Sequence, residues 1–128
     1  MKGIEMEILH KIQEILAEIL DIENQEITPE TYVVRELDAE SIDLLELAVA
    51  LNSKFNIEVK DDELFLRTFR FYITEAEEQK SDTEQYLVGK FPFLTKKRVK
   101  EIISDLEGGP TLKVKDLISY VSWRCERN

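Results

Sequence analysis

The sequence contains one cysteine and one histidine, and this shortage removes several kinds of function. A single thiol, Cys125, excludes an internal disulfide framework and fits a reducing compartment; we interpret it as an inert or incidentally exposed group. The single imidazole, His10, lies in a predicted amphipathic helix and is interpreted as a surface residue. A serine nucleophile needs a positioned base and an oxyanion hole, and no G-x-S-x-G elbow is present. The pattern therefore disfavours a hydrolase.

Positive charge is also scarce. Lysine and arginine number 17 against 27 aspartates and glutamates, which gives a formal net charge of −10. Like charges repel, so nucleic acid and anionic membranes are poor partners, and basic protein surfaces are the natural complement. The acids Asp61, Asp62 and Glu63 are consecutive, unlike the alternating ligands and glycine of a calcium loop. They predict a negatively charged helix start and no metal site.

Long hydrophobic runs are missing as well. Charged residues such as Lys2, Glu5 and Glu7 interrupt every apolar stretch near the N-terminus, so we expect no signal peptide and no stable membrane insertion. Repeats, low-complexity tracts and alternating strands joined by Asn-Gly or Asp-Gly turns are absent too, which favours an all-α fold. With 128 residues, 43% of them hydrophobic, the chain predicts one cytoplasmic domain over 1–128 with a real core.

Apolar residues at helical spacing predict a first helix over 4–20 and a central helix over 41–55. The segment 21–40 is expected to be a loop with one short helical turn after Pro29, pinned to the core by Val33, Val34 and Leu37. Further expected elements follow in chain order: a helix from Asp61 or Asp62 to about Ala76, a polar loop over 75–83, a short helix from Asp82 through Leu87, a helix over 96–106 stopped by Gly108-Gly109-Pro110, and a last helix over 114–123.

The central helix carries two apolar stripes. One stripe is expected to face the core: Leu44, Leu47, Ala48, Leu51 and Phe55. Ile42, Leu45 and Val49 form the second, about 100° to 160° around the helix. Either an inserted segment covers the second stripe, or it is an exposed docking strip bordered by Asp43 and Glu46. We favour the docking strip.

Ser41 opens this helix, and a serine there is by itself most often a cap. Its surroundings point elsewhere. Glu-Ser-Ile-Asp over 40–43, followed by Leu-Leu-Glu-Leu-Ala-Val-Ala-Leu and then Lys-Phe-Asn-Ile-Glu-Val, resembles the signature of acyl carrier proteins, in which Asp-Ser-Leu opens the second helix. The stretch from Ile27 to Leu37 resembles the first loop of that family. The serine, the acids and the apolar stripe all fall in register with it.

The resemblance implies a four-helix bundle that is a carrier and not an enzyme, with no catalytic residues. A phosphopantetheinyl transferase would attach 4'-phosphopantetheine from coenzyme A to Ser41, and the terminal thiol would carry acyl groups as thioesters. Acyl-loading and acyl-transfer enzymes with basic docking surfaces would be the partners of a monomer. The positions that match the family's partner-facing residues, together with the acid before the serine, are Glu40, Ile42, Asp43, Leu45, Glu46 and Val49.

The cargo stays open at this point. Fatty acid or specialised lipid and cell-envelope biosynthesis is preferred, and an aminoacyl or polyketide carrier is the alternative. An unmodified, carrier-like module that only docks enzymes is a third possibility. Glu40 and Ile42 replace the aspartate and leucine usual around the serine, and Asn52, Ser53 and Lys54 make the helix end less acidic. The first two departures leave open which transferase recognises the protein, and the reduced acidity predicts a specialised set of partners.

The largest departure is an insertion over about 65–110, which enlarges the bundle with a helical segment before the last helix. It could be an extension that only enlarges the core. It could instead widen or cap an acyl-binding interior through its aromatic residues, or form a basic docking site. The aromatic candidates are Phe65, Phe69, Tyr72, Phe91 and Phe93, and the basic candidates are Lys96, Lys97, Arg98 and Lys100.

Overall fold

A computed structural model describes residues 2–127, and over this range the chain is all-α, as the sequence predicts. Seven α-helices are present among the described residues, with no strand and a single isolated bridge between Tyr32 and Lys113. Their bounds are α1 Lys2–Leu20, α2 Ser41–Phe55, α3 Asp61–Leu64, α4 Phe69–Glu78, α5 Thr83–Lys90, α6 Lys96–Asp105 and α7 Val114–Glu126, with short 3-10 turns at Asn24–Glu26 and Leu106–Gly108.

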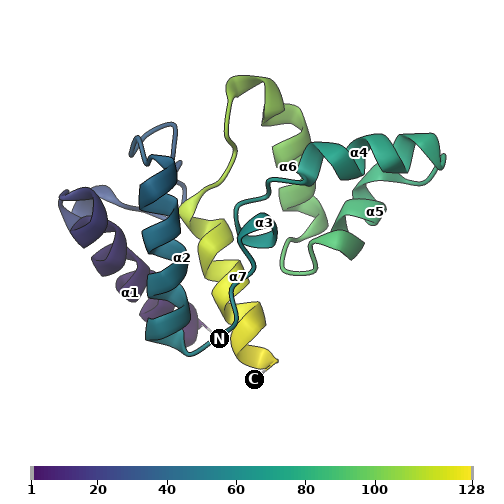
Figure 1. The fold of residues 1–128 in the computed structure, drawn as a ribbon. Helices are drawn as coiled ribbons and strands as arrows, with labels where there is room; N and C mark the ends of the chain where they lie inside the picture. Colours follow the sequence, from purple (N-terminus) through teal and green to yellow (C-terminus); the bar gives the residue numbers. More distant parts are fainter. Residues whose placement is uncertain (1, 128) are drawn as a thin grey trace.

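The helices form a four-helix bundle with an added lobe (Figure 1). α1 packs against both α2 and α7, and the short α3 packs against α7. The tyrosine hydroxyl of Tyr120 on α7 accepts a hydrogen bond from the Lys60 N–H at 3.0 Å and donates one to Glu63 of α3 at 3.0 Å. Helices α4, α5 and α6 pack in sequence order on the other side of α3 and α7 from α1 and α2. The expected enlarged bundle is therefore present.

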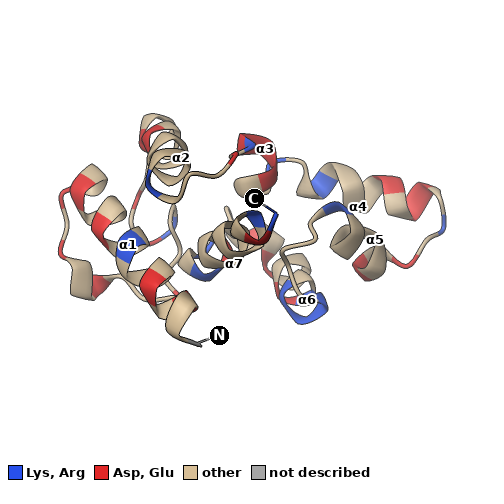
Figure 2. Ribbon diagram, turned by 90° about the horizontal axis from the view of Figure 1, so that it is seen from below, with Lys and Arg blue, Asp and Glu red and all other residues tan. Residues whose placement is uncertain are grey.

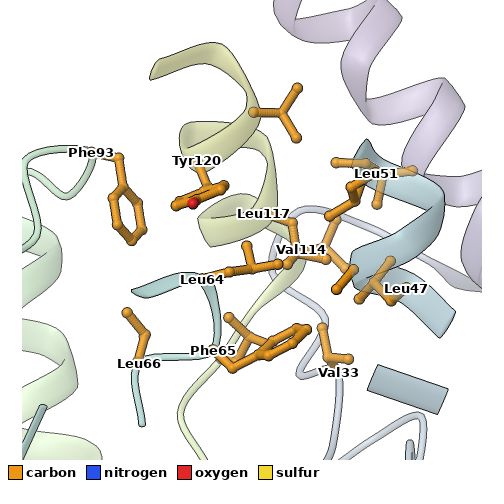
Figure 3. Packing of buried hydrophobic residues seen from close by; sticks show 14 of the residues in the cluster. Val33, Leu47, Leu51, Leu64, Phe65, Leu66, Phe93, Val114, Leu117 and Tyr120 are labelled. Atoms are coloured by element: carbon orange, nitrogen blue, oxygen red, sulfur yellow. The ribbon is translucent and has the colours of Figure 1, made fainter. Parts of the chain in front are cut away.

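The core lies between α1, α2 and α7, and the predicted inward face of α2 points into it. Leu47, Ala48 and Leu51 are buried, while Leu44 and Phe55 are half-buried against the same cluster. Figure 3 shows Leu47 and Leu51 of α2 facing the apolar side chains of α7 and α3. Burying each large side chain contributes roughly 1.5–3 kcal/mol, so this shared face stabilises the bundle.

The insertion is joined to this core by a chain of aromatic rings. Phe69 stacks on Phe91 with ring centroids 5.4 Å apart, Phe91 meets Phe93 edge to face at 6.2 Å, and Phe93 meets Tyr120 of α7 at 5.0 Å. All four side chains belong to one continuous buried cluster that also contains the α2 residues. The insertion therefore enlarges the core of the bundle, which is the first of the roles considered for it.

A buried ion pair makes a second link between the insertion and α7. Arg98 on α6 is 7% exposed and Asp116 on α7 is 1% exposed. Arg98 donates to both carboxylate oxygens at 2.7 Å, and its Nη2 also donates to the Thr111 carbonyl at 2.8 Å. The prediction that Arg98 belongs to an exposed basic docking site is wrong, because its side chain points inward and is fully paired. Lys100 lies 3.8 Å from Glu84, and Lys96 and Lys97 are exposed.

The helix expected from Asp61 to about Ala76 is broken in the structure. α3 ends at Leu64, Leu66 takes a left-handed conformation with φ of 58°, and α4 begins at Phe69. A non-glycine residue in this conformation costs roughly 1–2 kcal/mol, so packing must offset it. Leu64, Leu66 and Phe69 are all buried, and the break lets them reach the core together. α4 then runs to Glu78, into the stretch predicted to be a loop.

The loop before α2 also differs from the prediction. Its helical turn is Asn24–Glu26, which precedes Pro29, and hydrogen-bonded turns follow from Tyr32 onward. The expected anchor is confirmed for Val33, which is fully buried and whose N–H donates to the Leu112 carbonyl at 3.0 Å. Leu37 is half-buried against the core cluster. The loop is thus fastened to the segment that leads into α7.

Candidate functional site

Ser41 is the first residue of α2, and the helix cap is its neighbour Glu40. The Glu40 N–H donates to the Asp43 carboxylate at 2.8 Å, so these two acids satisfy the helix start between them. Ser41 is therefore not the helix cap. Its side chain is exposed and makes no hydrogen bond with the residues that the structure describes. The hydroxyl is left available, at a helix end that favours an attached negative group by about 0.3–1 kcal/mol.

An exposed apolar strip follows Ser41 along α2. Ile42 is 64% exposed, Leu45 55% and Val49 67%, and they are three of the six large hydrophobic side chains exposed among the described residues. Asp43 and Glu46 border the strip, and the insertion does not cover it. The alternative of a covered second stripe is wrong. An apolar strip left in solvent on a helix start is a candidate surface for contact with another protein.

The strip is part of a shallow groove of about 850 Å³ that continues onto α1. Ile15, Glu18 and Ile19 of α1 form its other side, and Ser53 and Lys54 close it at the end of α2. The pattern of the sequence around Ser41 did not predict this contribution from α1. Ile19 lies at the edge of the apolar face of α1 and is half-buried. This edge position could have indicated the contribution of α1, because a helix packed beside α2 places such residues along the same groove.

A second groove, of about 450 Å³, lies on the side of Ser41 that faces the insertion. Ser41 and Leu44 of α2 line one wall, and Phe65, Arg67 and Arg70 are among the residues of the other. Its size falls within the range of small-molecule sites, which is about 300–1,000 Å³. Of the five aromatic residues proposed to widen an acyl-binding interior, only Phe65 lines this groove. Phe69 and Phe91 lie in the core cluster instead.

A polar clamp holds the loop at the end of this groove in place. The Tyr32 hydroxyl donates to Asp105 at 2.6 Å, and Arg35 donates to Asp105 Oδ1 at 3.0 Å and to the Gly109 carbonyl at 2.9 Å. These hydrogen bonds from Tyr32 and Arg35 hold the pKa of the Asp105 carboxyl below its ordinary value. A Cβ on Gly108 would lie 3.1 Å from the Arg35 guanidinium, so glycine lets the loop pass closely over Arg35.

Other kinds of site find little support among residues 2–127. No group of three or more histidine, cysteine, aspartate or glutamate side chains is placed to hold a metal ion there. His10 and Cys125 are both exposed, and exposure was predicted for His10 from its place in an amphipathic helix. None of the helices in this range is long and apolar enough to cross a membrane.

A family profile described as "Phosphopantetheine attachment site" matches residues 10–70, a range that contains α2 and Ser41 and ends inside α4. An "Acyl carrier protein" of Helicobacter pylori (strain J99 / ATCC 700824) is 41% identical over 58 residues, which are 45% of this chain and 74% of that protein. A protein of the same name from Rubrobacter xylanophilus is 46% identical over 57 residues, 44% of this chain and 70% of that protein.

A longer match is to a "Meromycolate extension acyl carrier protein" of Mycolicibacterium aurum, 34% identical over 95 residues, which are 71% of this chain and 98% of that protein. No solved structure matches. The exposed serine at the start of α2 thus lies within the region that the attachment-site profile describes.

Proposed function

We propose that this chain, which belongs to the acyl carrier protein family, carries acyl groups as thioesters on a 4'-phosphopantetheine arm attached to Ser41. Membership of the family makes the chain a carrier and not an enzyme, and the attachment-site match implies the covalent arm. The observation that supports Ser41 is its exposed hydroxyl, free of hydrogen bonds to the described residues, on the first residue of α2. The arm supplies a thiol for thioester formation.

The residues around Ser41 fit such an arm on two counts. A phosphodiester on Ser41 would lie at the positive end of the α2 dipole. The groove of about 450 Å³ that Ser41 helps to line offers space for a tethered chain to lie against the protein. The other hydroxyls and acids of α2 need no catalytic role, because the transferase supplies the base that takes the proton from Ser41 Oγ.

We propose that partner enzymes dock on the strip beside Ser41. Glu40, Asp43 and Glu46 would meet basic residues of the partner, and the exposed apolar side chains of Ile42, Leu45 and Val49 would be buried on contact. Charge attraction speeds the encounter, and a small apolar contact permits quick release. The partners would include the phosphopantetheinyl transferase and the enzymes that load and use the acyl group.

The pathway we propose is fatty acid or specialised lipid and cell-envelope biosynthesis, in a cytoplasmic monomer with one domain over 1–128. The lipid pathway is supported by relatives whose name refers to meromycolate extension. A single domain is supported by the continuous buried cluster that joins the insertion to α2 and α7. The exposed, unpaired thiol of Cys125 agrees with a reducing compartment.

Intact-mass measurement after incubation with coenzyme A, magnesium and a phosphopantetheinyl transferase tests the attachment. We expect the mass of one 4'-phosphopantetheine to be added to the wild-type chain and nothing to be added to Ser41→Ala. Ser81→Ala, which changes an exposed serine after α4 and away from both grooves, is the matched control and should accept the arm fully. If several transferases add no mass to the folded wild-type chain, the protein is an unmodified docking module and the proposal is lost.

A further inference from the structure

The groove on the insertion side of Ser41 has an unusual charge for this chain. Among the described residues that line it, Arg67 and Arg70 are the only charged ones, and none is an aspartate or a glutamate. The chain as a whole carries a net charge of −10. A groove lined by two cations and no carboxylate is therefore unlike the rest of the protein. Figure 2 shows the acidic α3 in red and basic positions in blue on the segment that follows it and at the start of α4. The lining is complementary to an anion.

The two arginines also lack an acidic partner. Arg35, Arg98 and Arg124 each form an ion pair, with Asp105, Asp116 and Glu63. Neither groove arginine comes within ion-pair distance of a carboxylate of the described residues. Apart from these two, Arg127, beside the end of the described range, is the one arginine there with no such pair. The positive charges in the groove are thus left uncompensated.

The contacts that hold the Arg67 and Arg70 side chains leave most of their N–H donors free. The Arg67 guanidinium lies over the Phe65 ring, 5.5 Å from its centroid, and Arg70 donates one hydrogen bond to the Leu106 carbonyl at 3.0 Å. A guanidinium has five N–H donors in a planar fork that matches the oxygens of a phosphate. Ring contact and a backbone bond therefore position the arginines across the groove without saturating them.

We propose that Arg67 and Arg70 form an oxyanion site that holds the phosphodiester of the arm on Ser41. This inference rests on the proposed function, which places that phosphodiester on a residue of the same groove. Because the group is tethered there, its local concentration is high and even a modest attraction keeps it in place. The insertion then acts as a wall that retains the arm in the groove, and a basic partner must compete with Arg67 and Arg70 to draw it out.

The test compares the arm-bearing protein with three variants of it. Arg67→Gln/Arg70→Gln removes both charges, Arg67→Gln alone keeps the Arg70 bond to Leu106, and Arg127→Gln makes the same chemical change outside the groove. Intact mass first establishes that each variant carries the arm, and failure at this step counts against the proposed attachment and not against the arginine site. All three arginines are exposed, so the variants should fold.

The readouts are the ³¹P NMR shift of the phosphodiester and the midpoint of thermal unfolding. In wild type we expect the ³¹P resonance to be displaced from its position in the urea-unfolded protein, and added salt to shrink that displacement. Arg67→Gln/Arg70→Gln should lose most of the displacement, Arg67→Gln part of it, and Arg127→Gln none. Attachment of the arm should raise Tm by about 3 °C more in wild type than in the double variant.

Two results would overturn the proposal. One is an equal ³¹P displacement and an equal rise in Tm on arm attachment in wild type and in Arg67→Gln/Arg70→Gln. The other comes from loading the arm with either a butyryl or a glutaryl group, which differ in a terminal carboxylate. If the two arginines affect Tm only in the glutaryl form, the anion they hold belongs to the cargo and not to the arm.

Discussion

Arg98 of α6 and Asp116 of α7 form a bidentate ion pair in which both side chains are buried and both carboxylate oxygens lie 2.7 Å from the guanidinium nitrogens. The same carboxylate accepts the Lys113 N–H at 2.9 Å and so caps the start of α7. One pair of side chains thus fixes the insertion to the last helix of the bundle and helps to begin that helix. The insertion is therefore held firmly against α7 where α6 contacts it.

Replacing Arg98 should therefore be costly. Arg98→Met leaves the buried Asp116 without its charged partner, and we expect a loss of about 3–5 kcal/mol in the free energy of unfolding. Urea unfolding followed by circular dichroism measures it. The control is Lys97→Met at the exposed neighbouring position, which should change stability by no more than about 0.5 kcal/mol. Equal small losses in both variants would mean that the pair contributes nothing.

The docking strip can be tested without disturbing the fold. Val49→Ser removes apolar surface that is 67% exposed, so stability should hardly change while affinity for a partner enzyme falls. We expect roughly tenfold weaker binding, or about 1.4 kcal/mol, for an apolar side chain that the partner buries in part. Phe71→Ser is the matched control, because Phe71 is 62% exposed but lies on α4. Titration calorimetry with the transferase gives both affinities; a larger effect from Phe71 would move the surface to α4.

The clamp on Asp105 predicts a dependence of stability on pH. Its pKa is lowered in the folded protein by the hydrogen bond from Tyr32 and by Arg35, so it contributes stability above its unfolded-state pKa of about 3.9. That contribution is lost as the pH falls through the folded-state pKa. Tyr32→Phe removes the larger cause, and we expect lower stability at pH 7 together with a smaller loss between pH 7 and pH 3.

The matched control for this change is Tyr72→Phe. Tyr72 also packs its ring in the structure, 5.1 Å from the Lys90 ammonium, but its hydroxyl makes no hydrogen bond to a carboxylate among the described residues. Chemical denaturation at several pH values should give Tyr72→Phe the acid sensitivity of the wild type. If Tyr32→Phe also keeps the full wild-type loss at low pH, the hydrogen bond to Asp105 does not govern that titration.

Lys80 offers a position where a substitution should stabilise the protein. It follows the end of α4 with φ of 57°, and the Ser81 N–H donates to the Ala76 carbonyl at 2.9 Å, which is the pattern of a left-handed helix end. Glycine takes this conformation without steric cost, so Lys80→Gly should raise the free energy of unfolding by about 0.5–1 kcal/mol. Gln79→Gly, at φ of −84°, should lower it, and thermal unfolding of the two variants gives the comparison.

The local patterns of the sequence predicted most helices because helix periodicity depends on residues only three or four apart. The core face of α2 at Leu47, Ala48 and Leu51 is an example, and so is the exposed stripe at Ile42, Leu45 and Val49. The break at Leu66 could not be predicted in the same way. The periodic pattern from Leu64 to Ala76 fits one helix, and only the burial of Leu66 and its neighbours in the core that they share with the distant α7 favours two.

Charged and polar residues were the hardest to place from the sequence. Lys96, Lys97, Arg98 and Lys100 read as one basic run, yet Arg98 turns inward because Asp116 lies opposite it, 18 residues further along the chain. A serine at the position of Ser41 is by itself most often a cap; the surrounding motif argued against that role, and the structure shows that Glu40 and Asp43 satisfy the helix start instead. In both cases the local sequence allowed two arrangements, and the hydrogen-bonding partner seen in the structure decided between them.

The sequence by itself determined the all-α fold, the position of Ser41 at the start of α2 and the two apolar stripes behind it, because these follow from short-range periodicity and from the order of residues around one serine. Only the tertiary structure decided that the insertion shares the core, that Arg98 is buried, and that Arg67 and Arg70 line a groove with Ser41. The physical reason is that burial and pairing depend on contacts between residues far apart in the chain, which no local pattern encodes.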